Sequence, residues 1–247
     1  MPGPPLDERL PRLEPAPASL PARPSSRFER EAREAGYVWV AGVDEVGRGC
    51  LFGPVVAGAV VLDPDRPIRG LNDSKMLDRA SREALAERIR ERAVACATAS
   101  VDAGWIDRIN IYQAARVAME QALAKLSVAV DFVLTDAMRL QVAIPHRPLI
   151  KGDARCRSIA AASILAKVER DAWMRRWAEI YPEYNLARNK GYSTPDHLEA
   201  LERHGPTPAH RFSFAPVAAV AGFSVALPAE ARLDPQMSLF AVGGGDV

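Results

Sequence analysis

Cysteines are few in this chain, and long apolar runs are missing. The three cysteines, Cys50, Cys96 and Cys156, are widely spaced and form no Cys-x-x-Cys pair, which argues against a disulfide framework or a structural zinc site. A reducing compartment fits this pattern best. The chain also begins without the apolar segment of a secretory signal, and its most hydrophobic stretches are too short or too rich in glycine to cross a bilayer. We therefore expect a soluble protein of the cytoplasm.

Net charge is also nearly absent, because 32 Lys and Arg residues stand against 31 Asp and Glu residues among 247. The charges are nevertheless unevenly distributed. Residues 37–136 carry 12 basic and 14 acidic side chains, whereas residues 137–217 carry 13 and 8. The second segment is therefore the better candidate for binding phosphate groups. With 48% apolar and 26% charged residues and no internal repeat, the composition excludes collagen-like, coiled-coil and wholly disordered proteins.

Prolines and small residues mark the two ends of the chain. Eight of the first 24 residues are proline, so residues 1–36 are predicted to form a flexible arm with a short helix over 28–35. Residues 218–247 combine small apolar residues, prolines and three consecutive glycines, and they are predicted to form a flexible tail. The remaining residues 37–217 are long enough to bury a core and are expected to fold as one domain.

Apolar periodicity within residues 37–217 predicts both strands and helices. The first two strands are separated by a glycine-rich turn and are expected to pair antiparallel. Later strands alternate with helices, which indicates an α/β sheet of mixed strand direction. The predicted strands cover residues 37–43, 54–62, 93–101, 132–135 and 148–151, and the predicted helices cover residues 74–92, 107–126 and 158–177.

Four acidic residues lie at or just past the ends of predicted strands. Asp44 and Glu45 follow the first strand, and Asp136 and Asp153 follow two later ones. Because neighbouring strand ends of an α/β sheet converge on one crevice, these carboxylates can share a site in which a cation relieves their repulsion. Oxygen ligands favour Mg²⁺ or Mn²⁺, and two such ions about 3.5–4 Å apart suit phosphodiester hydrolysis. The alternative for each acid taken singly is a solvated residue at a strand end.

Five segments resemble, in the same order, the motifs of the ribonuclease HII family, the type 2 ribonucleases H. They are GVDEVGRGCLFGPVVAGAVVL (42–62), NDSK (72–75), KGDARCRSIAAASILAKVERD (151–171), NKGY (189–192) and HGPTPAHRFSFAPV (204–217). The resemblance implies an α/β ribonuclease H-like fold, with a five-stranded mixed sheet flanked by helices and a helical C-terminal part. It also implies an endoribonuclease that cleaves the RNA strand of RNA–DNA hybrids and incises duplex DNA on the 5′ side of single ribonucleotides.

The resemblance also assigns roles to individual residues. It implies that Asp44, Glu45, Asp136 and Asp153 bind Mn²⁺ or Mg²⁺, whereas Asp171 is not a ligand. It implies that Gly47, Arg48 and Gly49 sense the ribose at the cleavage site, that Tyr192 stacks on that ribose and that Lys75 contacts a phosphate. A backbone that approaches a 2′-hydroxyl closely must lack Cβ atoms, which suits the two glycines. The sequence departs from the family at Cys50, Phe52, Ala137 and Met138, which affects the predicted shape of the substrate cleft.

Eight other basic residues lie within residues 155–190. These cations are expected either to line a duplex-binding surface or to form ordinary solvated helix faces. They are Arg155, Arg157, Lys167, Arg170, Arg175, Arg176, Arg188 and Lys190.

One alternative function is another nuclease of the ribonuclease H-like fold, which has no need for the Gly-Arg-Gly turn. A second is a catalytically silent hybrid-binding protein, which the presence of all four carboxylates does not support.

A short motif near the C-terminus indicates a protein partner. Gln236, Leu239 and Phe240 form a Gln-x-x-Leu-Phe pattern, which resembles the peptide by which bacterial replication and repair proteins bind the sliding clamp. A tail without a core leaves such an apolar pair available to a partner's pocket. The alternative is that the pair packs on the protein's own surface. We otherwise expect a monomer.

Overall fold

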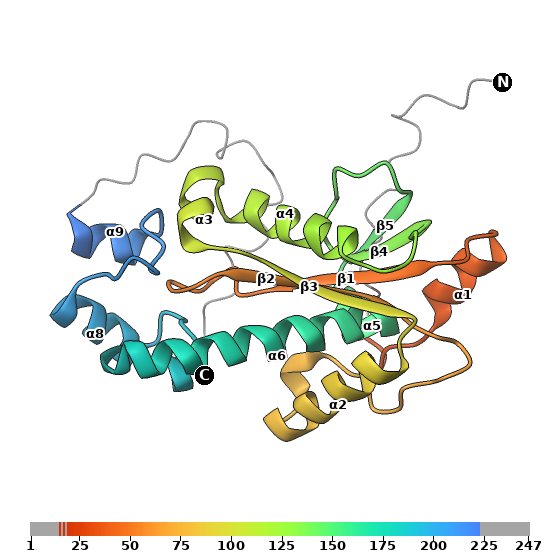
Figure 1. Cartoon of the computed structure of the whole chain (residues 1–247), viewed down its shortest axis with the longest axis horizontal. Helices are drawn as coiled ribbons and strands as arrows, with labels where there is room; N and C mark the ends of the chain where they lie inside the picture. Colours follow the sequence, from red (N-terminus) through yellow and green to blue (C-terminus); the bar gives the residue numbers. More distant parts are fainter. Residues whose placement is uncertain (1–14, 16, 18, 223–247) are drawn as a thin grey trace.

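The computed structural model describes residues 15, 17 and 19–222 and contains a five-stranded sheet with helices on both faces (Figure 1). The strands are β1 (Val40–Val46), β2 (Val55–Val61), β3 (Ala95–Val101), β4 (Phe132–Asp136) and β5 (His146–Leu149). The helices are α1 (Arg27–Glu34), α2 (Arg79–Arg92), α3 (Ala103–Ile109), α4 (Ile111–Ala124), α5 (Gly152–Arg155), α6 (Arg157–Ile180), α7 (Leu186–Asn189), α8 (Pro195–His204) and α9 (Ala215–Ala221), with 3-10 turns η2 (Ser74–Met76) and η3 (Pro182–Tyr184). The predicted mixed α/β sheet of five strands is confirmed.

Strand β1 lies in the middle of the sheet, whose order is β3-β2-β1-β4-β5. It pairs antiparallel with β2 and parallel with β4, and β4 pairs parallel with β5. The carboxyl ends of β1, β4 and β5 therefore meet at one edge of the sheet. The ladder between β1 and β2 continues through the pair of Asp44 with Gly58. For this reason β1 extends to Val46, three residues beyond the predicted end of the first strand.

Helix α6 packs directly on β1 and β2 because both strands carry a glycine where the helix crosses them. A Cβ atom at Gly42 would overlap the backbone of Ser158, and one at Gly58 would overlap the carbonyl oxygen of Ala162. Residues 158–163 of α6 are serine, alanine and one isoleucine, and all six are buried. The small side chains on both sides bring the helix close to the central strand.

Two predicted helices are interrupted by capping residues. The helix predicted over 107–126 is divided at Asn110, which has a φ of 65° and whose side chain accepts a hydrogen bond from the N–H of Gln113 (3.0 Å). The helix predicted over 74–92 is divided into η2 and α2. The side chain of Asp78 caps α2 by accepting a hydrogen bond from the N–H of Ser81 (2.8 Å). In both places a side-chain hydrogen bond starts a new helix.

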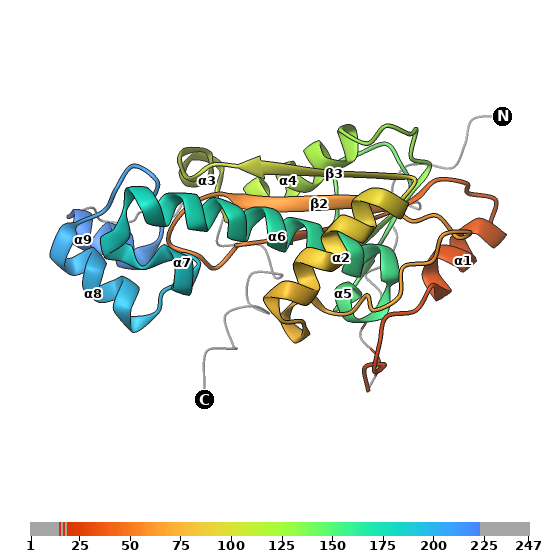
Figure 2. The ribbon, with the colours of Figure 1, turned by 60° about the horizontal axis from the view of Figure 1, so that its bottom comes forward.

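The helices form layers on the two faces of the sheet and a group beyond one end of it. In Figure 1, α4 lies on one face and α6 on the other, with α2 outside α6. Figure 2 shows α7, α8 and α9 gathered around the C-terminal half of α6. This is the helical C-terminal part that the resemblance implies. Within the described residues, no helix is both long and apolar enough to cross a membrane.

Residues 25–36, which the sequence analysis placed in the N-terminal arm, include α1, and this helix packs on the sheet. Phe28 and Ala32 are buried in one cluster with Val40, Leu134 and Leu149. The short helix predicted over 28–35 is thus present at Arg27–Glu34. The proposed clamp-binding peptide lies outside the described residues.

The close contact between α6 and the sheet predicts a large effect of a single methyl group. Replacing Gly58 with alanine places the new Cβ against the backbone of Ala162, which cannot move without displacing the helix. We expect Gly58→Ala to lower the free energy of unfolding by about 1–3 kcal/mol. Gly49→Ala is the matched control, because a Cβ there meets nothing within 4 Å, and we expect a change within about 0.5 kcal/mol. Urea unfolding measures both, and equal stability of the two variants would contradict the proposed close packing.

Candidate functional site

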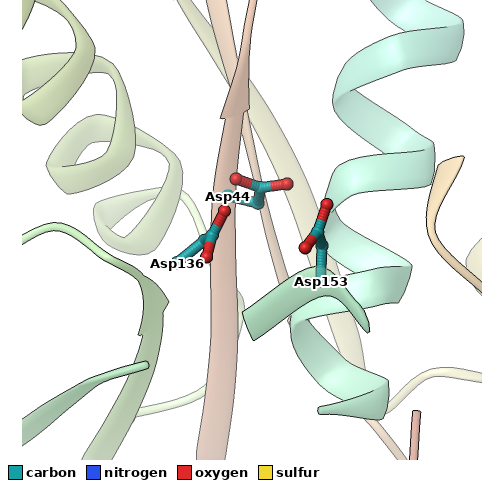
Figure 3. A group of neighbouring side chains, drawn as sticks. All are labelled: Asp44, Asp136 and Asp153. Carbon is teal, nitrogen blue, oxygen red and sulfur yellow. The ribbon is translucent and has the colours of Figure 1, made fainter. Parts of the chain in front are cut away.

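Three aspartates converge at the sheet edge where β1, β4 and β5 end. Asp44 lies on β1, Asp136 is the last residue of β4, and Asp153 lies on α5, just after β5. One carboxylate oxygen from each lies within 4.8 Å of the others. Figure 3 shows the three carboxylates pointing toward one another. Three of the four predicted acidic ligands thus form one group.

Backbone amides orient these carboxylates. The N–H of Glu45 donates to Asp44 Oδ1 (2.8 Å), and the N–H of Gly152 donates to Asp136 Oδ1 (2.7 Å). Asp153 Oδ1 accepts a hydrogen bond from the N–H of Ala154 (2.9 Å). Each carboxylate is therefore held by the chain at the end of its own strand or at the following turn.

Burial and nearby negative charges raise the pKa values of all three aspartates. The pKa of Asp44 lies well above its ordinary value, because burial and the charges of Asp136, Glu45 and Asp153 disfavour its anion. Burial, then the charges of Asp153 and Glu45, raise the pKa of Asp136 to about 7. The pKa of Asp153 is raised by burial and then by Asp73, with Lys75 opposing the shift. The group carries more negative charge than the protein alone stabilises, so a divalent cation fits there.

Glu45 lies beside this group but is not one of the three closely spaced residues. Its Oε1 is 3.3 Å from Arg48 Nη1, and its Oε2 is buried without a hydrogen-bond partner within the described part of the chain. Burial raises the pKa of Glu45, although Arg48 opposes the shift. An unpartnered buried oxygen next to three carboxylates fits the role of a fourth metal ligand. Hard oxygen donors suit Mg²⁺ or Mn²⁺ rather than zinc.

The two glycines of the Gly-Arg-Gly turn have different surroundings. Gly47 is buried with a φ of +94°, and a Cβ there would overlap the side chain of Arg170. Gly49 is exposed, and nothing lies within 4 Å of the position of its missing Cβ. The fold itself therefore requires glycine at position 47. Gly49 is the more open of the two positions, and the resemblance to the ribonuclease HII family implies a ribose-sensing role for both glycines.

Two buried arginines hold this turn in place. Arg170 is 0% exposed and donates to the carbonyl oxygens of Pro54 (3.1 Å), Phe52 (3.0 Å) and Lys190 (2.7 Å). Arg211 is also buried and donates to the carbonyl oxygens of two residues of the turn, namely Gly53 (3.0 Å) and Arg48 (2.9 Å).

This burial corrects the sequence-based prediction for two of the cations. Arg170 and Arg155 were placed among the residues expected on a duplex-binding surface or a solvated face, and both are buried. Arg170 binds backbone carbonyl groups of segments far away in the sequence, as described above. The role of Arg211 was missed altogether, because no local pattern marks an arginine whose partners lie about 160 residues away. Asp171, which is predicted not to be a ligand, forms ion pairs with Lys167 (2.8 Å) and Arg82 (3.9 Å).

The structure brings Tyr192 to the glycine turn. Cys50 and Tyr192 form an isolated antiparallel bridge, and the N–H of Leu51 donates to the carbonyl oxygen of Gly191 (2.8 Å). Tyr192 is nonetheless 39% exposed, so part of its ring faces outward. Burial and the neighbouring Cys50 raise the pKa of Tyr192 to about 12. The ring is therefore neutral and available for stacking.

Lys75 lies next to Asp153 of the carboxylate group. Its Nζ lies 3.9 Å from Asp153 Oδ2, although the side chain is 81% exposed. Burial lowers the pKa of Lys75, but Asp153 and the other nearby aspartates outweigh this effect and raise it. The hydrogen bond between Ser74 Oγ and Ser163 Oγ (2.9 Å) ties this turn to α6. An exposed cation next to the carboxylates suits contact with a phosphate.

Comparisons with known proteins point to one family. The chain matches the sequence model of the Ribonuclease HII family over residues 41–217. It is 58% identical over 232 residues to the Ribonuclease HII of Solibacter usitatus, with 94% of this chain and 99% of that relative covered. The ribonuclease H2 of Pyrococcus horikoshii OT3 has a TM-score of 0.64 at 26% identity, covering 75% of this chain and 98% of that one. The RNase HII of Archaeoglobus fulgidus, solved in a complex with PCNA, has a TM-score of 0.61 at 26% identity, covering 73% and 96% of the two chains.

The raised pKa of Asp136 predicts how stability depends on pH without metal. Between about pH 4 and 7 the folded protein holds a proton on Asp136 that the unfolded chain has lost, so the free energy of unfolding falls as the pH rises through this range. We expect the thermal midpoint in EDTA to be lower at about pH 8 than at about pH 5. Asp136→Asn should reduce this decline, because it removes the repelled charge, and excess Mg²⁺ should reduce it as well. Equal slopes for the wild type and the variant would contradict the electrostatic account.

Proposed function

Because the chain belongs to the ribonuclease HII family and is a metal-dependent endoribonuclease of RNA–DNA hybrids, we propose that it also incises duplex DNA on the 5′ side of single embedded ribonucleotides. The observation that carries this proposal is the continuity of the site. Residues 44–50 lead from the carboxylates directly into the glycine turn, and the bridge between Cys50 and Tyr192 places an exposed aromatic ring beside that turn. The residues proposed to recognise one ribose thus lie next to the carboxylates proposed to catalyse cleavage of the nucleic acid.

We assign the metal ligands to Asp44, Glu45, Asp136 and Asp153. These four carboxylates would hold two divalent ions, which would supply activation of a water and stabilisation of the leaving oxygen, and cleavage would then leave a 3′-hydroxyl and a 5′-phosphate. Asp44 comes from the central strand and is repelled by the charges of both Asp136 and Asp153, so it would hold a divalent ion together with them. Lys75 balances the charge of Asp153 and faces solvent, where a substrate phosphate would lie.

Recognition of the ribose is assigned to the open side of the turn and to Tyr192. The 2′-hydroxyl is the group that distinguishes RNA from DNA. At Gly49 the backbone is exposed and has no Cβ to keep a sugar at a distance. Arg170 and Arg211 fix the shape of the turn through its carbonyl groups, so the N–H groups remain at a defined place. Tyr192 would stack on the same sugar and thereby fix the position of the ribose relative to the carboxylates.

The substrate assignment predicts a selective loss of activity. Tyr192→Ala should reduce incision at a single embedded ribonucleotide about tenfold or more, since an aromatic stacking contact contributes about 1–3 kcal/mol. Gly49→Ala should also reduce this incision, because its new Cβ would keep the ribose away from the backbone. Cleavage of long RNA–DNA hybrids, which offer many registers, should fall less. Tyr192→Phe keeps the ring and should retain both activities. Rates on a duplex with one ribonucleotide, a long hybrid and an all-DNA duplex measure the effect.

Asp44→Asn is the reference for loss of chemistry in this assay. It removes one charge and little volume, so it should abolish cleavage of both substrates while the protein still binds the hybrid. Equal losses on the two substrates in Gly49→Ala and Tyr192→Ala would mean that these residues only support the fold. Absence of cleavage by the wild type at a single ribonucleotide would refute the proposed incision.

We further propose that the C-terminal peptide with Gln236, Leu239 and Phe240 binds a sliding clamp. The support is the Gln-x-x-Leu-Phe pattern and the solved complex of the RNase HII of Archaeoglobus fulgidus with PCNA. A short peptide with a few anchoring side chains should have modest affinity, on the order of micromolar. The double variant Leu239→Ala, Phe240→Ala should lose binding to the cognate clamp but cleave free oligonucleotides at the wild-type rate. Unchanged binding by this variant, or no binding by the wild type, would refute the proposal.

A further inference from the structure

The N-terminal helix α1 precedes residues 41–217, the segment that matches the family, yet residues just before α1 contact the corner that carries Asp153. The N–H of Ser25 donates to the carbonyl oxygen of Arg155 (3.0 Å), and the N–H of Arg157 donates to the carbonyl oxygen of Ser25 (3.3 Å). Ser25 and Cys156 form a parallel bridge through these bonds. The chain ahead of α1 thus runs along the junction between α5 and α6.

Glu29 of α1 caps the N-terminus of α6. Its side chain is buried, with the residue only 2% exposed, and its Oε1 accepts hydrogen bonds from the N–H of Ser158 (2.7 Å) and from Cys156 Sγ (3.2 Å). Cys156 is the N-cap residue of α6 and makes no capping hydrogen bond with its own side chain. A carboxylate supplied from another helix therefore takes this role, at the helix end where a negative charge is favourable.

The capped junction lies between two parts of the metal site. Asp153 is three residues before Cys156, on the single turn of α5. Ser163, in the second turn of α6, forms a hydrogen bond with Asp44 that stabilises the Asp44 anion. A change in the direction of α6 at its first turn would move both residues. Because Asp44 itself lies on β1, a shift of the α5–α6 corner would change the distance between Asp153 and Asp44.

Other contacts dock α1 independently of Glu29. Phe28 is buried against the sheet, and Glu31 Oε2 pairs with Arg147 Nη1 at 2.8 Å. Removing the Glu29 carboxylate should thus leave α1 in place and release only the N-terminus of α6. The Oε2 atom of Glu29 is buried and has no hydrogen-bond partner among the described residues. An amide nitrogen at that position would break no existing bond.

We propose that Glu29 is a positioning residue of the metal site, acting through the N-terminus of α6 on the distance between Asp153 and Asp44. This inference rests on the proposed metal site. If Glu29 has this role, α1 contributes to the metal site although the helix precedes the segment that matches the family. A role in stability alone would leave the metal affinity of the folded protein unchanged.

The test is Mn²⁺ affinity, measured by calorimetry on full-length variants at a temperature well below their thermal midpoints. Glu29→Ala should weaken Mn²⁺ binding measurably, by up to about tenfold, which is the lower end of the loss seen when a hydrogen-bond partner of a metal ligand is removed, because Glu29 acts on the ligands only through α6. Glu29→Gln should keep the wild-type affinity, because its amide oxygen can accept the same hydrogen bond from Ser158. Glu34→Ala is the matched control, since Glu34 is an exposed acid of the same helix, and it should have no effect.

Two outcomes would overturn the inference: wild-type Mn²⁺ affinity in folded Glu29→Ala, or equal weakening in Glu29→Ala and Glu29→Gln. If Glu29→Ala does not fold, Glu29→Asp replaces it, because the shorter side chain keeps the charge but withdraws the oxygen from Ser158. Wild-type affinity in Glu29→Asp would then overturn the inference. The variant Asp153→Asn tests the proposed metal site independently of the role of Glu29. Unchanged Mn²⁺ binding in Asp153→Asn would refute the proposed site, whereas a loss there together with a normal Glu29→Ala would refute only the role of Glu29.

Discussion

The repulsion among three carboxylates, two buried and one half-buried, at one edge of the sheet is the constraint on which the rest of the structure depends. Asp44, Asp136 and Asp153 come from three different elements, and each is held where its anion is disfavoured. Such a group persists only if the surrounding chain is rigid enough to prevent the side chains from separating. The backbone amides of residues 45, 152 and 154 supply part of that rigidity by binding the carboxylate oxygens directly.

Helix α6 supplies most of the remaining rigidity. Its first turns cross β1 and β2 at Gly42 and Gly58, and the absence of two Cβ atoms lets it lie against the central strand. Further along the same helix, Arg170 binds the carbonyl groups of the glycine turn, and Trp177 packs against Phe52. One helix therefore connects the carboxylate group, the turn that faces the substrate and the helical C-terminal part. A shift of α6 would disturb all three, and the N-terminus of α6 is held by the buried side chain of Glu29 from α1.

Local patterns predicted much of this arrangement. The apolar runs of β1 and β2 and the glycine turn between them were sufficient to predict an antiparallel pair, since hydrophobic patterning and turn residues act within a few positions of each other. The order of strands and helices predicted a mixed sheet, and Asp44, Asp136 and Asp153 were recognised by their places at strand ends. Where the predictions failed, as at Asn110 and Asp78, a side chain caps a new helix inside a continuous apolar pattern. Because the spacing of apolar residues does not change at the break, periodicity alone cannot reveal where one helix ends and the next begins.

The sequence by itself determined the identity of the acidic residues, the glycine turn and the order of the elements, because each of these is written in neighbouring residues. Only the tertiary structure decided which charged side chains are buried. Arg170 resembles any helix arginine in the sequence, yet it contacts residues 116 and 118 positions away, and Glu29 reaches a backbone amide 129 positions away. Whether a charge lies in water or satisfies buried backbone groups depends on which distant segments surround it. That outcome follows from the packing of α1, α6 and the sheet against one another, and no local pattern in the sequence encodes it.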